Sequence, residues 1–225
     1  MPSKLSVSRL YPDVLDEDDN SAELSVPAEA ETETPKPKFM LVEAQKADGA
    51  KRGNATHLFM QFFDFASVGR LGIEGEIERL TREKFIFPSD ASLINRYALR
   101  RFFSGELARE MKKSTRVYRE KRFIINYPAE NFSENEEMRE SLQGEKLLVQ
   151  GIIDCAFFDE NGELILVDYK TDSFWNVPKE EAEQTLRERH SRQIGYYKYA
   201  CRELFGVPCA HAYIYSFALN KTIEI

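Results

Sequence analysis

The sequence is poor in cysteine, has no long apolar run and contains no Gly-Lys dipeptide. Its three cysteines lack CxxC spacing, so neither a disulfide framework nor an iron–sulfur cluster is expected. The most apolar stretch, residues 147–158, is interrupted by Gln150 and Asp154, which argues against a membrane span. Without Gly-Lys there is no P-loop, so no ATPase is expected in this chain. The N-terminus shows no signal-peptide pattern, and we expect a cytoplasmic location.

Charge and proline content divide the chain in two. Residues 1–40 hold nine acids and four bases, a net charge of −5, whereas the remaining 185 residues hold 29 acids and 27 bases, a net charge of −2. Four of the nine prolines lie in residues 11–38, which lack hydrophobic periodicity. We therefore expect an acidic, proline-containing linker over residues 1–38 and a folded domain over residues 39–225.

Hydrophobic periodicity predicts helices followed by strands. Helices are expected from Gly53 to residue 63, over residues 74–87, over residues 89–103 with Ser89 or Asp90 as N-cap, over residues 105–113, and over residues 179–205, where Gly206 ends the helix. Strands are expected over residues 115–127, 147–158, 163–171, 209–217 and 222–225. The order predicts a mixed α/β fold with a helical part over about 39–114 and a core over about 115–225.

The hairpin of residues 147–171 carries two aspartates whose pairing depends on the turn. A three-residue loop with Gly162 in the left-handed region makes Asp154 and Asp168 direct cross-strand neighbours, with Cβ atoms about 5 Å apart. A two-residue Asn-Gly turn instead pairs residue 154 with residue 169 and puts the two acids on opposite faces. We favour the first register.

Two carboxylates on such apolar strands repel each other and are poorly solvated, and a divalent cation removes both problems. Lys170 follows Asp168 by two residues and therefore points to the same face of the strand. Carboxylates, a divalent cation and an ammonium group suit phosphodiester hydrolysis, because the cation neutralises phosphate and the lysine stabilises developing negative charge.

The triplet Asp168-Tyr169-Lys170 is weak evidence by itself. The same pattern occurs by chance in Glu110-Met111-Lys112, which lies in a predicted helix. The paired Asp154 and the apolar strands around it favour a functional interpretation of the hairpin triplet.

Residues 151–172 (GIIDCAFFDENGELILVDYKTD) resemble the central motif of the PD-(D/E)XK nucleases of the RecB type. Downstream, Gln193 and Tyr197 match the QxxxY motif of that family. Upstream, residues 53–57 (GNATH) resemble its G-T-A-x-H helix, with Asn54 where the family has threonine. Residues 117–123 (VYREKRF) resemble its acid-bearing strand. Within the family, the likeness is greatest to the C-terminal nuclease domain of AddA-type helicase–nucleases.

The resemblance implies a restriction-endonuclease-like mixed sheet flanked by helices, with a bound Mg²⁺ that Mn²⁺ can replace. The implied metal ligands are His57, Asp154, Asp168 and the Tyr169 carbonyl. Lys170 is the implied catalytic lysine, and Glu120 is a further catalytic candidate acting through water. Taken alone, His57 would be an ordinary core or surface histidine and Glu120 a solvated residue of a strand face. We interpret His190 and His211 as structural.

Gln193 and Tyr197 share one helix face, and the resemblance gives them a role in supporting the site or contacting DNA. Core packing is the alternative for Tyr197. Residues 96–122 hold ten bases against three acids, which suits phosphate contacts from residues such as Arg96 and Arg100. An ordinary solvated helical face is the alternative for this stretch.

The function implied by the resemblance is that of a Mg²⁺-dependent DNA nuclease domain in an ATP-dependent helicase/nuclease. Such an enzyme acts in double-strand-break repair and recombination. Its expected partners are single-stranded DNA from unwound ends, the helicase part of the same parent chain and an AddB-type partner protein, and this domain would cut the 3′-ended strand. Two alternatives stay open: a catalytically silent module that docks DNA or another protein, and a free-standing RecB-like nuclease.

Overall fold

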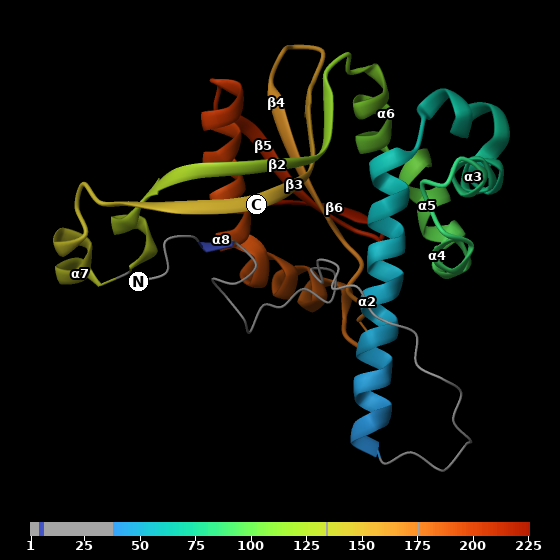
Figure 1. The fold of residues 1–225 in the computed structure, drawn as a ribbon, viewed down its shortest axis with the longest axis horizontal. Coiled ribbons are helices and arrows are strands. Elements are labelled where there is room, and N and C mark those ends of the chain that lie inside the picture. The colour runs from blue at the N-terminus through green and yellow to red at the C-terminus, as the bar shows by residue number, and fades with distance from the viewer. Residues whose placement is uncertain (1–4, 7–37, 134, 175) are drawn as a thin grey trace.

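The computed structural model describes residues 5–6, 38–133, 135–174 and 176–225, with side chains from residue 49 onward. Its elements in chain order are β1 (Leu5–Ser6), α2 (Lys38–Phe62), α3 (Phe65–Arg82), α4 (Pro88–Leu93), α5 (Arg96–Ser104), α6 (Glu106–Lys113), β2 (Val117–Pro128), η2 (Ala129–Phe132), α7 (Glu136–Ser141), β3 (Lys146–Phe158), β4 (Leu164–Lys170), α8 (Lys179–Phe205), β5 (Cys209–Ser216) and β6 (Lys221–Glu224). This order confirms the predicted mixed α/β fold with helices before the sheet (Figure 1).

The strands form one six-stranded sheet in the order β1-β3-β4-β5-β6, with β2 paired to β3. β2 runs antiparallel to β3 along its whole length, so β4 and β1 must share the other edge of β3. On that edge, β4 pairs with residues 155–158 and β1 pairs with residues 149–150. Residues 151–154, which lie between them, have no described strand partner on this edge, and the sheet opens there.

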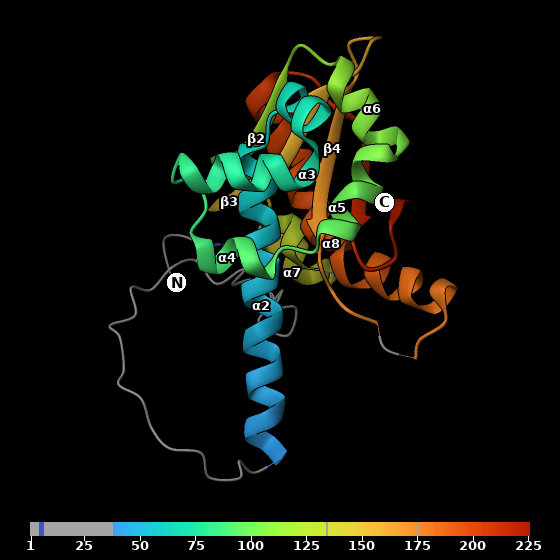
Figure 2. The same ribbon diagram turned by 90° about the vertical axis from the view of Figure 1, so that its right-hand side faces the viewer.

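Two hydrophobic cores lie on opposite faces of the sheet. One packs helices α2 to α6 against it through residues such as Phe59 and Phe102. The other packs α8 against it through Leu186 and Ile194. Figures 1 and 2 show the two helical layers with the sheet between them. Each large apolar side chain buried in this way contributes about 1.5–3 kcal/mol.

Beyond the body of the sheet, β2 and β3 extend as a two-stranded arm with α7 near its tip (Figure 1). Aromatic rings hold the arm against α8. Tyr127 of β2 lies 5.0 Å from Tyr196 between ring centroids, and Phe132 stacks on Tyr196 at 5.5 Å. The long hairpin is therefore anchored by packing as well as by its hydrogen-bond ladder.

Two turn predictions are confirmed by left-handed glycines. Gly162 in the β3–β4 loop has a φ of 82°, and Gly206 after α8 has a φ of 72°. The Gly206 N–H bonds to the Arg202 carbonyl, which closes the last turn of α8. The strand pair predicted over residues 209–217 and 222–225 is present as antiparallel β5 and β6.

Three predicted helix boundaries are wrong. α2 begins at Lys38 rather than at Gly53, because residues 38–52 consist mostly of good helix formers although they lack a clear apolar stripe. The helix expected over residues 74–87 spans Phe65–Arg82, since the Asp64 side chain caps it by accepting from the Ser67 N–H.

The helix predicted over residues 89–103 is two helices, α4 and α5. Asn95 interrupts it, because its side chain accepts from the Ala98 N–H and starts a new helix. The predicted caps Ser89 and Asp90 are inside α4, which begins at Pro88, a favoured first helical residue.

The linker prediction for residues 1–38 falls almost entirely outside the described residues and stays a prediction. Leu5 and Ser6, which are described, run parallel to β3 beside Val149 and Gln150. Among the described residues, no helix is both long and apolar enough to cross a membrane.

Candidate active site

The candidate site lies where β3 and β4 separate. Their ladder runs from Phe158↔Leu164 to Cys155↔Val167, which confirms the predicted three-residue-loop register. One step further, the Asp154 Oδ2 accepts a hydrogen bond of 2.8 Å from the Tyr169 N–H. The Asp154 side chain thus replaces a strand-to-strand bond at the point where the strands part.

The strands β2 and β3 also bend at this point. Glu120, opposite Asp154, has a φ of 46°, a left-handed value that is uncommon for a residue with a side chain. Ile153 and Cys155 flank Asp154 but pack into different hydrophobic cores, so the face of β3 changes at Asp154. Such strained backbone costs about 1–3 kcal/mol and is typical of functional sites.

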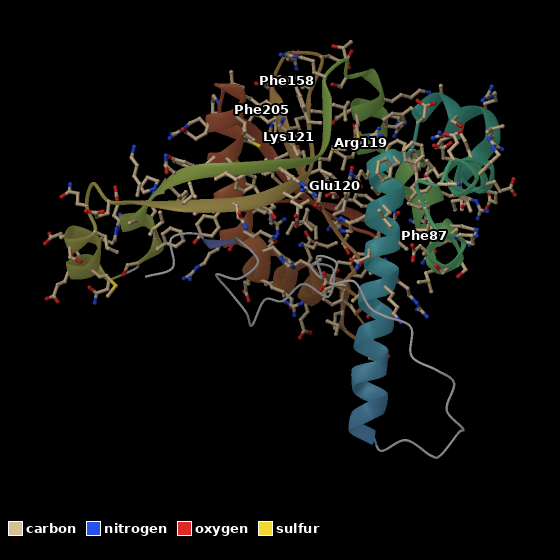
Figure 3. All side chains as sticks on the ribbon, viewed as in Figure 1. Phe87, Arg119, Glu120, Lys121, Phe158 and Phe205 are labelled. Atoms are coloured by element: carbon tan, nitrogen blue, oxygen red, sulfur yellow. The ribbon has the colours of Figure 1, made fainter. Side chains whose placement is uncertain are left out.

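Three side chains from α2, β2 and β3 meet beside this bend. The His57 Nδ1 lies 3.8 Å from the Glu120 Oε1 and 3.7 Å from the Asp154 Oδ1. One donor atom from each residue lies within 4.8 Å of the other two. Ligands on opposite sides of a Mg²⁺ ion are about 4.2 Å apart, so the three fit around a single divalent cation with a small adjustment. Figure 3 shows Glu120 beside α2, the helix that carries His57.

Burial raises the pKa of Asp154 to about 8. The negative charges of Asp168 and Glu120 add to this rise, while His57 and Lys170 oppose it. Because the carboxylates repel each other in a poorly solvated space, a cation among them is electrostatically favoured. The donor set of one imidazole and hard carboxylate oxygens fits such a cation.

Asp168 and Lys170 form a buried ion pair on β4. The Lys170 Nζ lies 3.2 Å from the Asp168 Oδ2, and the two residues are 3% and 2% exposed, lysine first. The contact confirms that they share one face, as the spacing of two predicts. Asp168 is not part of the compact set of three donors, and nothing in the sequence indicated that Glu120 would be.

The backbone of β4 orients the Tyr169 carbonyl. The Phe217 N–H bonds to the Lys170 carbonyl, so that carbonyl points toward β5. Carbonyls alternate along a strand, and the Tyr169 N–H already points at Asp154 on β3. The Tyr169 carbonyl is therefore directed toward the opening between β3 and β4, where the predicted ligands lie.

Gln193 and Tyr197 approach the site from α8. The Gln193 Nε2 donates to the Tyr197 hydroxyl over 3.1 Å, which confirms that they share a helix face. Burial raises the pKa of Tyr197 well above its usual value, and the charges of Asp168 and Asp154 raise it further. His190 is buried, and its Nδ1 lies 3.3 Å from the Gln193 Oε1. This contact was not predicted, although the place of His190 three residues before Gln193 was a signal.

The two predicted DNA-binding arginines are engaged within the helical layer. Arg96 donates to the carbonyls of Ile94 and Ala91 at the α4–α5 junction, and Arg100 forms an exposed ion pair with Glu74. Their predicted contacts with DNA stay predictions.

A sequence profile of the PD-(D/E)XK nuclease superfamily matches residues 30–222 of the chain. The chain belongs to this superfamily. The PD-(D/E)XK motif accordingly comprises Asp154 and the Asp168-Tyr169-Lys170 segment, which the fold brings together across the β3–β4 hairpin.

Relatives of this superfamily member are similar along most or all of the chain. An AddA-type ATP-dependent helicase/nuclease of Clostridium botulinum (strain Hall) is 35% identical over 228 residues, which cover 100% of this chain and 17% of that protein. The protein of the same name from Clostridium kluyveri is 35% identical over 196 residues, covering 84% of this chain and 15% of that protein. The chain thus spans less than a fifth of the length of these relatives.

Substitutions at Glu120 test the strain at the bend. Glu120→Gly and Glu120→Ala both remove the carboxylate, but only glycine adopts a φ of 46° without steric cost. We expect Glu120→Gly to be more stable than Glu120→Ala by about 1 kcal/mol in chemical denaturation with EDTA present.

Lys121 provides the matched control, because it follows Glu120 and is not among the residues with positive φ. There the order should reverse, since glycine weakens an ordinary strand relative to alanine. Equal or lower stability of Glu120→Gly relative to Glu120→Ala would contradict the interpretation of this site as strained.

The raised pKa of Asp154 predicts a pH-dependent stability in the absence of metal. Between the unfolded value of 3.8 and the folded value of about 8, the folded state binds more protons than the unfolded state. The free energy of unfolding should therefore fall as pH rises from about 5 to about 8. Asp154→Asn keeps an acceptor for the Tyr169 N–H and should show a smaller fall in Tm over this range.

Divalent cations should reverse this trend, because they compete with the proton for Asp154. Added Mn²⁺ should raise the Tm of the parent more at about pH 8 than at about pH 6, and should leave that of Asp154→Asn almost unchanged. Parallel Tm curves for parent and variant, with and without Mn²⁺, would refute the role of Asp154.

Proposed function

We propose that this chain is a Mg²⁺-dependent DNA nuclease domain that hydrolyses phosphodiester bonds. The observation that carries the proposal is the convergence of His57, Glu120 and Asp154 beside the buried Asp168–Lys170 pair. Membership of the PD-(D/E)XK nuclease superfamily supports the reaction class. Mn²⁺ would substitute for Mg²⁺, and no iron–sulfur cluster is part of the proposal.

In this proposal the ion is held by His57, Asp154, Asp168 and the Tyr169 carbonyl, with Glu120 close by. A divalent ion there supplies neutralisation of the phosphate charge and a lowered pKa for water. The arrangement draws on four elements, α2, β2, β3 and β4, so the site exists only in the folded chain. Glu120 is placed to hold a water through its second carboxylate oxygen.

Lys170 acts directly on the reacting phosphate. Its ammonium group is held by Asp168 and remains on the face that carries Asp154. When water attacks phosphorus and the bond to the leaving oxygen breaks, the lysine stabilises the negative charge that develops. Burial strengthens this effect, because a charge interacts more strongly in a medium of low dielectric constant.

DNA contacts are proposed for Gln193 and Tyr197 on α8 and for Arg96 and Arg100 on the helical layer. The Gln193 amide and the Tyr197 hydroxyl form a pair that can face a backbone phosphate near Asp168. Arg100 is exposed in its pair with Glu74, and such surface pairs are weak enough to be exchanged for a phosphate.

The names of the relatives support a larger context for this activity. We propose that the domain belongs to an ATP-dependent helicase/nuclease, that the helicase lies in the same parent chain and that an AddB-type protein is the partner. The helicase would deliver single-stranded DNA from broken ends, and this domain would cut the 3′-ended strand in recombinational repair in the cytoplasm. The ATPase would lie outside these 225 residues.

A cleavage assay on single-stranded DNA with Mg²⁺ or Mn²⁺ tests the proposal. Asp168→Asn and Lys170→Met should each lower kcat by roughly 10²-fold or more, since each removes a charge that acts at the reacting phosphate. The decoy triplet on α6 supplies matched controls, because Glu110→Gln and Lys112→Met change the same residue types far from the hairpin triplet in the sequence.

The control variants should cleave at the parental rate. Unchanged cleavage by Asp168→Asn and Lys170→Met would refute the catalytic assignment. A parent that binds DNA but shows no metal-dependent cleavage would favour a docking module instead.

A further inference from the structure

We propose that Arg119 is a positioning residue that holds the His57-bearing helix and the Glu120-bearing strand at the separation needed for the metal site. This inference rests on the proposed function and assigns a role to a residue that touches no reacting atom. Figure 3 shows Arg119 next to Glu120 and beside α2.

The guanidinium of Arg119 is attached to the end of α2. Its Nη1 donates to the Phe63 carbonyl over 2.5 Å, and its Cζ lies 3.8 Å from the centroid of the Phe63 ring. Phe63 continues the helix, because its N–H bonds to the Phe59 carbonyl. A cation at this end satisfies a carbonyl without a helical partner and is favoured by the helix dipole.

The same helix carries His57, six residues before Phe63. This spacing corresponds to about 9 Å along the helix axis, so a contact at Phe63 fixes the depth and rotation of His57. On the strand side, Arg119 pairs with Cys155 in the β2–β3 ladder, next to Asp154. Arg119 therefore links all three elements that supply the compact donor set.

The backbone strain at Glu120 makes such an anchor necessary. A left-handed φ persists only when the surrounding contacts over-determine it. The residue before Glu120 is fixed by its side chain on α2 and by its ladder partner on β3, and the ladder resumes at Lys121↔Ile153. Without the Arg119 contact, the Glu120 carboxylate would be free to turn away from His57.

A direct contact of Arg119 with DNA is the alternative, since Arg119 belongs to the basic stretch of residues 96–122. Its guanidinium is partly buried against Phe63, whereas Lys121 and Arg122 on the same strand are exposed. The two roles predict opposite effects on cation binding. Removal of a positive charge near the site favours a cation if charge alone matters, and weakens its binding if the donors lose their arrangement.

Binding of Mn²⁺ alone, without DNA, to the 225-residue chain tests the inference by electron paramagnetic resonance of the free ion. Arg119→Met should weaken Mn²⁺ binding about tenfold, the usual effect of losing a residue that supports a metal ligand. Arg119→Lys keeps the charge but loses the planar stacking, and should restore binding only in part. Arg122→Met is the matched control, with the same loss of charge on an exposed side chain, and should bind as the parent does.

Far-UV circular dichroism shows whether each variant is folded. If Arg119→Met fails to fold, Phe63→Leu replaces it, because it removes the stacked ring and leaves the charge; it should also weaken Mn²⁺ binding. Binding of Arg119→Met, or of this replacement, that equals or exceeds that of Arg122→Met overturns the inference while leaving the proposed function intact. A parent that binds no Mn²⁺ overturns the proposed function and this inference together.

Discussion

The charge balance around Asp154 is the constraint on which the rest of the structure depends. Its carboxylate is 13% exposed, feels the negative charges of Asp168 and Glu120, and is opposed by Lys170 and His57. A protein gains no stability by confining acids in this way, because each raises the free energy of ionising the next. The arrangement is understandable if a divalent cation completes the site, and each nearby structural feature serves to keep the acids together.

The sheet provides the place for these groups by opening between two cores. β3 is long enough to pair with β4 over its last residues and with the arm-forming β2 over its whole length, and Asp154 lies where these two pairings diverge. The hydrogen bond from the Tyr169 N–H holds Asp154 at the opening. The helical layer adds His57, and α8 adds Gln193 and Tyr197, so both layers converge on the exposed edge of β3.

Much of the site was predictable because it depends on local rules. The Gly162 turn determines the hairpin register, the spacing of two places Lys170 beside Asp168, and the spacing of four places Gln193 beside Tyr197. The left-handed φ of Glu120 and the engagement of Arg119 with Phe63 were not predictable, because both arise from tertiary packing between α2 and β2. The helix boundaries failed for a related reason, since the side-chain caps of Asp64 and Asn95 outweighed the apolar pattern.

The location of a bound ion tests the account most directly. Crystals grown with Mn²⁺ and measured near the manganese absorption edge would reveal the ion by its anomalous scattering. The account predicts a peak in the opening between β3 and β4, in direct contact with His57, Asp154 and Asp168. A well-ordered crystal with no peak at that opening, or with Mn²⁺ bound only at other carboxylates, would contradict it.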